Sequence, residues 1–250
     1  MIAIRPLFRH YLAEKFIKKH LLVKSKIVDI GCGQGDFDFQ MAEKGYGVEC
    51  FEFSGEAADV FKETKVRKNL PNIQLHETNF FDYPQNPNAD AIVSFEVLEH
   101  IEEDFKALKK MNSWLKENGY LIISIPAHQK MWGYGDIVAG HKRRYEKKEL
   151  KELLEQAGFS VIQLYSPGFP WLNVLQVIRN FYFKITNPHI SGNDESRTKK
   201  SSVIIKLPSF VKLFFNPITL YPFIMISNLF NNFDLSEGYF VAAQKSKDAQ

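Results

Sequence analysis

The chain has 250 residues, 45% of them hydrophobic, which is enough for one large α/β domain with an ample core. Its formal charge of +3 is small, and it carries no polybasic block or basic–aromatic ladder, which speaks against a nucleic-acid partner. Two cysteines are too few for a disulfide framework and the seven histidines are scattered, so we expect a cytoplasmic protein without a metal site.

The N-terminal region predicts an amphipathic helix. Charged residues recur every few positions up to Lys26, a pattern that does not fit a signal peptide. The apolar residues that suggest the helix are Leu7, Tyr11, Ile17 and Leu21.

A strand, a glycine-rich turn and a helix follow. The apolar, β-branched run Ile27–Ile30 predicts a buried parallel strand, and residues 37–44 predict a helix. Three glycines lie between them at alternate positions: Gly31, Gly33 and Gly35. A dinucleotide fingerprint would place its third glycine at position 36, but Asp36 stands there and would repel a pyrophosphate. The turn therefore favours a nucleotide-like ligand without phosphates.

This run resembles the first motif of the class I S-adenosylmethionine-dependent methyltransferases, which have Asp29 and the three glycines at the same places. The resemblance implies S-adenosylmethionine as cofactor. It also implies a Rossmann-like, doubly wound, seven-stranded sheet that is mostly parallel and has an antiparallel last strand.

A second predicted strand, Val48–Phe53, delivers Glu52 near its carboxyl end. An acidic residue at this distance from the glycines can accept hydrogen bonds from both ribose hydroxyls, and the neighbouring Phe53 joins the predicted cofactor site. The alternative is a solvated carboxylate at the end of a strand.

The third predicted strand, Ile73–Glu77, is followed by Asn79 and Phe80. Many members of the family carry Asp where Asn79 stands, and that Asp accepts a hydrogen bond from the adenine amino group. Asn keeps a carbonyl acceptor but loses the charge, so the resemblance implies a weaker contact here. Phe80 either packs on the adenine or belongs to the core.

The fourth predicted strand, Ala89–Phe95, leads into the run Glu96-Val97-Leu98-Glu99-His100. Ligands of open α/β sheets lie beyond the carboxyl ends of the strands, so Glu96 is predicted near the methyl donor. The run resembles the Glu-x-Leu-Glu-His segment of the ubiquinone-biosynthesis type of O-methyltransferase. His100 is a candidate general base, or it orients the loop by hydrogen bonding to backbone, which is the role we favour.

The second half of the predicted sheet continues the alternation of strands and helices. A helix is predicted from Phe105 to a stop at Asn118-Gly119, and a fifth strand over Tyr120–Ile125. A further helix, residues 150–157, and a sixth strand, Phe159–Tyr165, follow a polar loop.

That loop resembles a subgroup of the family in residues Trp132, Asp136, His141, Arg143, Arg144 and Tyr145. The resemblance places His141 opposite the sulfonium of the cofactor, as a candidate base for an acceptor hydroxyl. Trp132 and Tyr145 are predicted substrate contacts. Arg143 and Arg144 either hold an anionic group of the acceptor or face solvent.

The last strand is predicted over Gly238–Gln244, and the connection before it is too long for an ordinary loop. We therefore divide the chain into a methyltransferase domain, residues 1–169 and 237–250, and an apolar helical insertion, residues 170–236. The polar stretch 191–202 predicts a hinge within the insertion, between apolar pieces over residues 171–185 and 203–233.

The role of the insertion has three candidates: a lid over an apolar acceptor, peripheral contact with a membrane surface through residues 203–233, or an interface between copies of the chain. Pro217 and Pro222 interrupt its uncharged window, and several asparagines would be expensive in lipid, so a simple membrane span is not expected. Lys206 and Lys212 suit a bilayer surface.

The sequence thus predicts a methyltransferase that moves a methyl group from S-adenosylmethionine to a small-molecule or lipid-linked acceptor, first of all to a hydroxyl oxygen. Two alternatives stay open: a nicotinamide-dependent oxidoreductase on the same architecture, and a non-catalytic module that binds the cofactor. We expect the protein in the cytoplasm, either free or peripheral to the inner face of the membrane.

Overall fold

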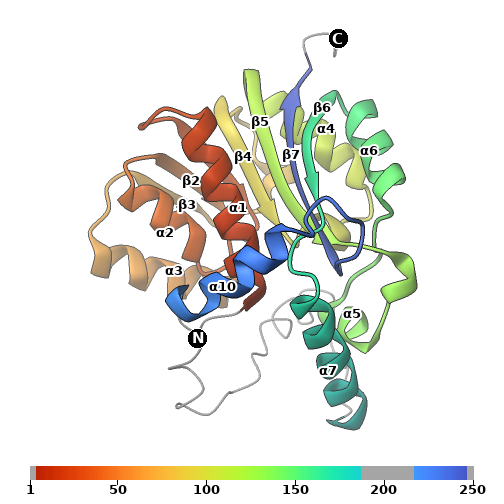
Figure 1. Cartoon of the computed structure of the whole chain (residues 1–250). Helices are drawn as coiled ribbons and strands as arrows, with labels where there is room; N and C mark the ends of the chain where they lie inside the picture. The colour runs from red at the N-terminus through yellow and green to blue at the C-terminus, as the bar shows by residue number, and fades with distance from the viewer. Residues whose placement is uncertain (1–3, 187–216, 247–250) are drawn as a thin grey trace.

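In the computed structural model, which describes residues 4–186 and 217–246, a seven-stranded sheet runs through the molecule (Figure 1). Its order is β3-β2-β1-β4-β5-β7-β6, and β7 pairs antiparallel with β5 and β6 whereas the pairs among β1–β5 are parallel. This confirms the predicted fold class. The strands are β1 Lys26–Ile30, β2 Gly47–Phe51, β3 Ile73–His76, β4 Ala89–Phe95, β5 Leu115–Pro126, β6 Phe159–Tyr165 and β7 Gly238–Lys245.

Helices cover both faces of the sheet. α1 (Ile4–His20), α2 (Asp36–Glu43) and α3 (Gly55–Lys68) pack on one face, where Phe16, Met41 and Phe61 belong to one buried cluster. α4 (Asp104–Trp114) and α6 (Lys147–Gln156) pack on the other. Neighbouring side chains of a strand point to opposite faces, so Ile27 joins the first cluster and Val28 the second. Burial on both faces explains why the adjacent residues Ile27 and Val28 of β1 are both apolar.

The end of α4 differs from the prediction. The helix ends at Trp114, not at Asn118-Gly119, and β5 begins at Leu115. Leu115 is 3% exposed and pairs with Ala89, whereas the next pair along the ladder is Tyr120 with Ala91. The turn residues therefore lie in a bulge of the strand, where Asn118 adopts a positive φ of 62°.

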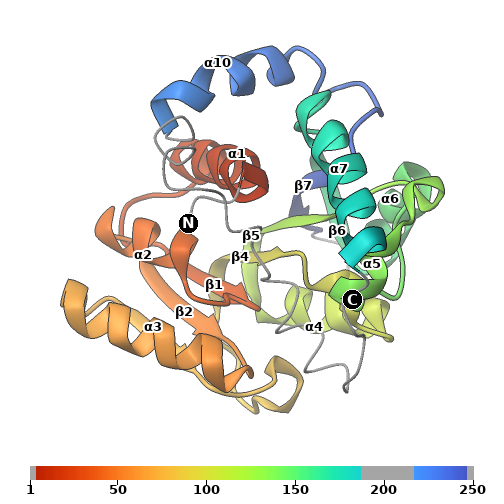
Figure 2. The same ribbon diagram turned by 90° about the horizontal axis from the view of Figure 1, so that it is seen from below.

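Short helices and two longer ones complete the structure. They are η1 Phe80–Asp82, η2 Leu98–His100, η3 Gln129–Met131, α5 Tyr134–Ala139, α7 Trp171–Thr186 and α10 Pro217–Asn228. α7 and α10 lie at the carboxyl end of the parallel strands, next to α1 (Figures 1 and 2). A small cluster of Phe8, Leu172 and Ile224 joins these three helices.

The division at residues 170 and 236 stays a prediction. The predicted hinge, residues 191–202, and the part 203–216 of the second apolar piece, with Lys206 and Lys212, lie outside the described residues. Among the helices that the structure describes, none combines the length and the hydropathy that crossing a membrane requires.

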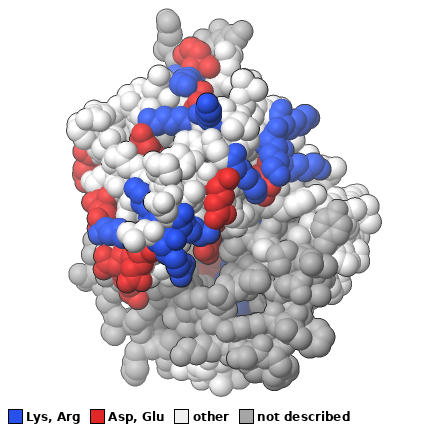
Figure 3. Space-filling model, turned by 90° about the vertical axis from the view of Figure 1, so that its left-hand side faces the viewer, with Lys and Arg blue, Asp and Glu red and all other residues white. Residues whose placement is uncertain are grey.

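Charges of both signs lie side by side on the side of the molecule drawn in Figure 3. Exposed ion pairs on α3 include Lys62 with Glu77 at 2.7 Å and Lys68 with Glu43 at 2.5 Å. Such pairs contribute little to stability because water screens them. Among the described residues on this side, the surface is mixed, in keeping with the small net charge of the chain.

Candidate functional site

The turn between β1 and α2 is built around its glycines. Gly31 has a φ of +77°, and a Cβ on it would lie 2.4 Å from Cγ2 of Val97. Gly35 has a φ of +81°, and a Cβ there would lie 2.5 Å from the ring of Phe61. Side chains are excluded at both places, because the backbone is left-handed and a neighbour already fills the space. Gly33 differs, since a Cβ on it would meet nothing within 4 Å.

Glu52 is fixed at this turn by two backbone groups. Its Oε2 accepts a hydrogen bond from the N–H of Gly33 at 3.0 Å, and its Oε1 accepts one from the N–H of Ser54 at 2.7 Å. Each carboxylate oxygen keeps a further lone pair. The carboxylate and the open space beside Gly33 therefore fit a nucleoside whose ribose donates hydroxyl hydrogens. Phe53, next in the chain, is 55% exposed.

The other predicted cofactor contacts lie in different surroundings. The Oδ1 of Asn79 accepts a hydrogen bond from the N–H of Phe81 at 3.0 Å and so caps η1, which leaves one lone pair. Phe80 is 6% exposed and packs in the core near Trp114. Asp29 is 3% exposed, and burial together with the charge of Asp38 raises its pKa well above the ordinary range.

A second group of polar residues follows β4. Glu96 has a φ of +58°, and its Oε1 lies 3.7 Å from the Nη1 of Arg9 on α1 and 3.2 Å from the Oγ of Ser124, which donates to it. Burial would raise the pKa of Glu96, but the charges of Arg9 and Arg5 outweigh it and lower the pKa. Glu96 is therefore an anion at neutral pH.

Glu99 is the buried acid of this group, and it was not among the predicted site residues. It is fully buried, and burial and the charge of Glu96 raise its pKa well above the usual value. Its Oε1 lies 3.7 Å from the Nε2 of His141 and 4.0 Å from the Nε2 of His100. The sequence signal was present in the Glu-x-Leu-Glu-His run.

His100 bonds to backbone. Its Nδ1 lies 3.1 Å from the carbonyl oxygen of Gly140, which can only accept, so Nδ1 carries the proton. Burial and the neighbouring His141 lower the pKa of His100 to about 4. The two rings meet edge to face at 5.0 Å. His100 thus holds the end of the loop that carries His141.

His141 is oriented by Asp136, a residue of α5. Its Nδ1 lies 2.8 Å from the Oδ1 of Asp136, and the Nε and Nη2 of Arg144 each lie 2.9 Å from the same oxygen. Burial would raise the pKa of Asp136, but the hydrogen bond from His141 and the charge of Arg144 lower it to about 2. Because an ionised carboxylate can only accept, Nδ1 of His141 carries the proton and Nε2 is left as an acceptor.

Of the remaining predicted substrate residues, Arg143 and Tyr145 meet at Asp104, whereas Trp132 and Arg144 have other surroundings. Arg143 pairs at the surface with Asp104 at 2.7 Å. Tyr145 is 1% exposed in the core, where its hydroxyl donates to Asp104 at 3.0 Å. Trp132 is half-buried after η3. Arg144 is buried and donates to the carbonyl oxygens of Ala127 and Glu237 besides its pair with Asp136.

A cavity at the carboxyl end of the strands brings part of this set together. His141, Glu96 and Arg144 line it, but the other predicted substrate residues do not. Sequence reasoning named none of the lining residues of α1 and α7, although it expected the N-terminal helix and offered the insertion that contains α7 as a lid. The further lining residues are Arg5, Phe8, Arg9, Ser124, Pro126, Pro167, Leu172, Glu237, Gly238, Tyr239 and Phe240.

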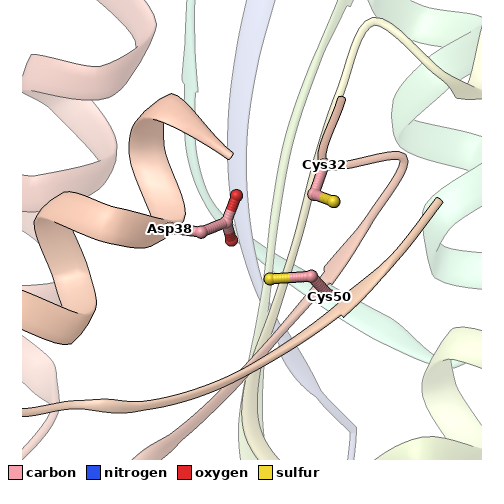
Figure 4. A group of neighbouring side chains, drawn as sticks. All are labelled: Cys32, Asp38 and Cys50. Atoms are coloured by element: carbon pink, nitrogen blue, oxygen red, sulfur yellow. The ribbon is translucent and has the colours of Figure 1, made fainter. Parts of the chain in front are cut away.

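Within residues 4–186 and 217–246, two groups of side chains could hold a metal ion. Glu99, His100 and His141 offer three ligand atoms within 4.8 Å of one another, next to the cavity. Cys32, Asp38 and Cys50 offer another three within the same distance, below the glycine turn (Figure 4). Neither group has the short sequence spacing of a zinc motif, which is why the sequence predicted no metal.

Comparison with known proteins gives a family match over most of the chain. Residues 6–164 match the family described as "Methyltransferase domain". The ubiquinone biosynthesis O-methyltransferase of Actinobacillus pleuropneumoniae is 28% identical over 48% of this chain and 53% of its own length. The chain thus spans about half the length of this relative. The demethylmenaquinone methyltransferase of Staphylococcus haemolyticus is 27% identical over 76% of this chain and 87% of its own length.

Solved structures share the fold at low identity. Phosphoethanolamine N-methyltransferase 2 of Haemonchus contortus, in complex with S-adenosylmethionine, gives a TM-score of 0.61 at 15% identity over 95% of this chain and 53% of its own. The [4+2]-cyclase SpnF gives 0.64 at 13% identity over 95% of this chain and 80% of its own. A fold shared by a methyltransferase and a cyclase does not by itself fix the reaction.

Proposed function

Because the chain belongs to the class I S-adenosylmethionine-dependent methyltransferases, we propose that it methylates a hydroxyl oxygen of a small-molecule or lipid-linked acceptor, with His141 as the general base. The observation that carries the proposal is the pairing of His141 with Asp136 at the edge of a cavity. A base helps when the acceptor is a hydroxyl, whose proton must leave as the C–O bond forms, or a protonated amine, whereas a neutral amine or a thioether can attack without one.

S-adenosylmethionine supplies a methyl group that is already activated on a sulfonium sulfur. The turn Gly31, Gly33 and Gly35 would let the backbone approach it, and the Glu52 carboxylate would accept from the ribose hydroxyls. The remaining lone pair of Asn79 Oδ1 would accept from the adenine amino group. Asp29, Phe53, Phe80 and Glu96 complete the proposed surroundings of the cofactor.

His141 has one nitrogen available for proton transfer. Asp136 holds the proton on Nδ1, so Nε2 accepts the proton of the acceptor hydroxyl as the new C–O bond forms. The resulting imidazolium is stabilised by the Asp136 carboxylate, which stays ionised because of Arg144. His100 keeps the loop in place through the carbonyl oxygen of Gly140.

The cavity suits an acceptor with one polar and one apolar end. His141, Glu96 and Arg9 line its polar part, whereas Phe8 and Leu172 offer apolar surface from α1 and α7. Both curated relatives carry names that refer to quinones, which are apolar ring compounds with oxygen substituents. A hydroxylated aromatic ring on an apolar chain is therefore the acceptor class we propose.

Peripheral contact with the inner face of a membrane belongs to the same proposal. One face of α7 exposes apolar side chains at helical spacing, and the C-terminal part of α10 exposes more. The exposed residues are Val174, Val177, Ile178, Phe181 and Ile185 on α7, and Phe223, Met225 and Ile226 on α10. An apolar face of this kind can lie in the headgroup region of a bilayer.

A pair of acceptors that differ in one atom tests the proposal. The protein is incubated with S-adenosylmethionine carrying a deuterated methyl group and with a prenylated aromatic diol or its amino analogue. We expect a deuterated methyl ether from the diol and little product from the amine. Methylation of the amine or of ring carbon instead, at a rate that the substitution His141→Gln leaves unchanged, would contradict both the oxygen acceptor and the base.

A further inference from the structure

The geometry points to a second site: Cys32, Asp38 and Cys50 bind a thiophilic divalent cation such as Zn²⁺ beneath the glycine turn (Figure 4). Cys32 belongs to the turn after β1, Asp38 to the first turn of α2, and Cys50 to β2. An ion held here would tie together the three elements that shape the turn.

The ligand atoms are close enough for one ion. They all lie within 4.8 Å of one another. Zn–S bonds of about 2.3 Å in a tetrahedral site put sulfur atoms about 3.8 Å apart, so small side-chain rotations would close the site. Two sulfurs and one carboxylate oxygen are a donor set that suits zinc and cadmium better than magnesium or calcium.

The carboxylate of Asp38 is buried and poorly paired. Asp38 is 1% exposed, and neither of its oxygens has a hydrogen bond of good geometry to a residue that the structure describes, although Asp29 and the Cys50 thiol lie close enough to favour its charged form. Asp29, whose carboxyl contacts that of Asp38, has an unpaired Oδ1 in the same part of the protein. A single proton shared by the two carboxyls would pair one oxygen of each and leave one oxygen of Asp38 without a partner. A bound cation would balance the buried negative charge and would also give the unpaired carboxylate oxygens a partner.

The two thiols would be neutral without a metal. Burial raises the pKa of Cys50 far above its ordinary value. A hydrogen bond from Cys50 favours the Cys32 thiolate, but burial and the nearby carboxylates outweigh it and raise the pKa of Cys32 to about 12. The thiolates form here when a cation displaces their protons. The affinity of the site for the cation should therefore increase with pH. Cys32 is partly exposed and gives the ion a way in.

Titration with Cd²⁺ alone tests the site on the full-length protein after treatment with a chelator and a reductant. Bonds between thiolate and cadmium absorb in the ultraviolet. We expect an absorption band that saturates at one Cd²⁺ per chain. The other metal-capable group, Glu99, His100 and His141, contains no thiol and cannot produce this band.

Variants separate the proposed site from simple binding to thiols. Cys50→Ser should abolish the band, and Asp38→Asn should weaken Cd²⁺ binding at least tenfold. The matched control is Asp36→Asn, an exposed carboxylate in the same helical turn, which should bind like the unchanged protein. If Cys50→Ser fails to fold, Cys32→Ser at the partly exposed position replaces it.

Either of two results would overturn the inference. One is the absence of a cadmium band from protein whose circular dichroism shows it folded. The other is a band whose midpoint is the same with Asp38→Asn as with Asp38 in place. Both readouts are independent of methyl transfer, so they stand apart from the proposed function.

Discussion

Nδ1 of His141 lies 2.8 Å from Oδ1 of Asp136, and the guanidinium of Arg144 contacts the same carboxylate oxygen. Both His141 and Arg144 follow α5 closely in the chain, so a short segment supplies the base, the group that orients it and the cation that keeps that group ionised. The side chain that faces the cavity therefore has a defined tautomer before any acceptor arrives.

Replacing the base should remove turnover without removing the cofactor. His141→Gln cannot accept the hydroxyl proton, and we expect kcat to fall by about 10²–10⁴-fold, the usual contribution of a general base. Steady-state rates and calorimetric titration with S-adenosylhomocysteine measure the two effects separately. His128→Gln is the control, since the side chain of His128 is 5% exposed against 7% for His141 and pairs with two carboxylates, Glu146 and Asp234, yet lies outside the cavity lining. Equal losses in both variants would assign His141 a structural role.

Asp136 should act through His141. Asp136→Asn presents an amide that can donate to Nδ1 and so can stabilise the wrong tautomer of His141. We expect kcat to fall by about 10²-fold or more while KM for the acceptor changes little. Glu146→Gln repeats the change at the His128 pair and should leave kcat unaltered. A rise in KM at constant kcat would show that Asp136 shapes the cavity and does not position the base.

Gly33 should be the glycine of the turn whose replacement affects binding more than folding. A Cβ there points into open space, whereas the left-handed φ of +57° costs about 1 kcal/mol for a residue with a side chain. Gly33→Ala should therefore unfold at a slightly lower temperature but bind S-adenosylhomocysteine at least tenfold more weakly. Gly55→Ala, at an open position without a positive φ, should change neither quantity appreciably. Unchanged affinity of Gly33→Ala would move the cofactor away from this turn.

His10 should make stability depend on pH. Burial and the charge of Arg9 lower its pKa to about 3, whereas the unfolded chain has the ordinary value near 6.5. Between these values the unfolded state binds more protons, so this contribution is complete above pH 6.5 and is lost as the pH falls toward 3. The His10→Phe variant and the unchanged protein are both unfolded with denaturant at pH 7 and at pH 5. Between these pH values the free energy of unfolding should fall by about 1–2 kcal/mol less for His10→Phe than for the unchanged protein. Parallel curves for the two proteins would contradict the low pKa.

The fold could be predicted from the sequence because its signals are local. β4 and β6 have the predicted bounds, since each is a short apolar run between turn signals. α4 shows the limit of this reasoning. Asn118 and Gly119 signal a helix end, but the burial of Leu115 in the sheet starts β5 earlier and turns the same residues into a bulge.

The site could be predicted only in part. Glu52 accepts a hydrogen bond from the N–H of Gly33, so two of the predicted cofactor residues do meet at the turn, and His141 and Glu96 do line one cavity. Phe8, Arg9 and Leu172 line it as well, yet they come from helices at distant places in the chain and meet through tertiary packing that no local pattern encodes. Tyr145 lies in the core, although the resemblance to a subgroup of the family had suggested a substrate contact.

Titration calorimetry with S-adenosylhomocysteine, repeated with NAD and with the Glu52→Ala variant, is the most direct test of the account. We expect saturable binding of S-adenosylhomocysteine, no binding of NAD, and an affinity for S-adenosylhomocysteine at least tenfold weaker once the Glu52 carboxylate is gone. If the folded protein bound NAD and not S-adenosylhomocysteine, or if Glu52→Ala bound as tightly as the unchanged protein, the proposed cofactor site at the glycine turn would be wrong.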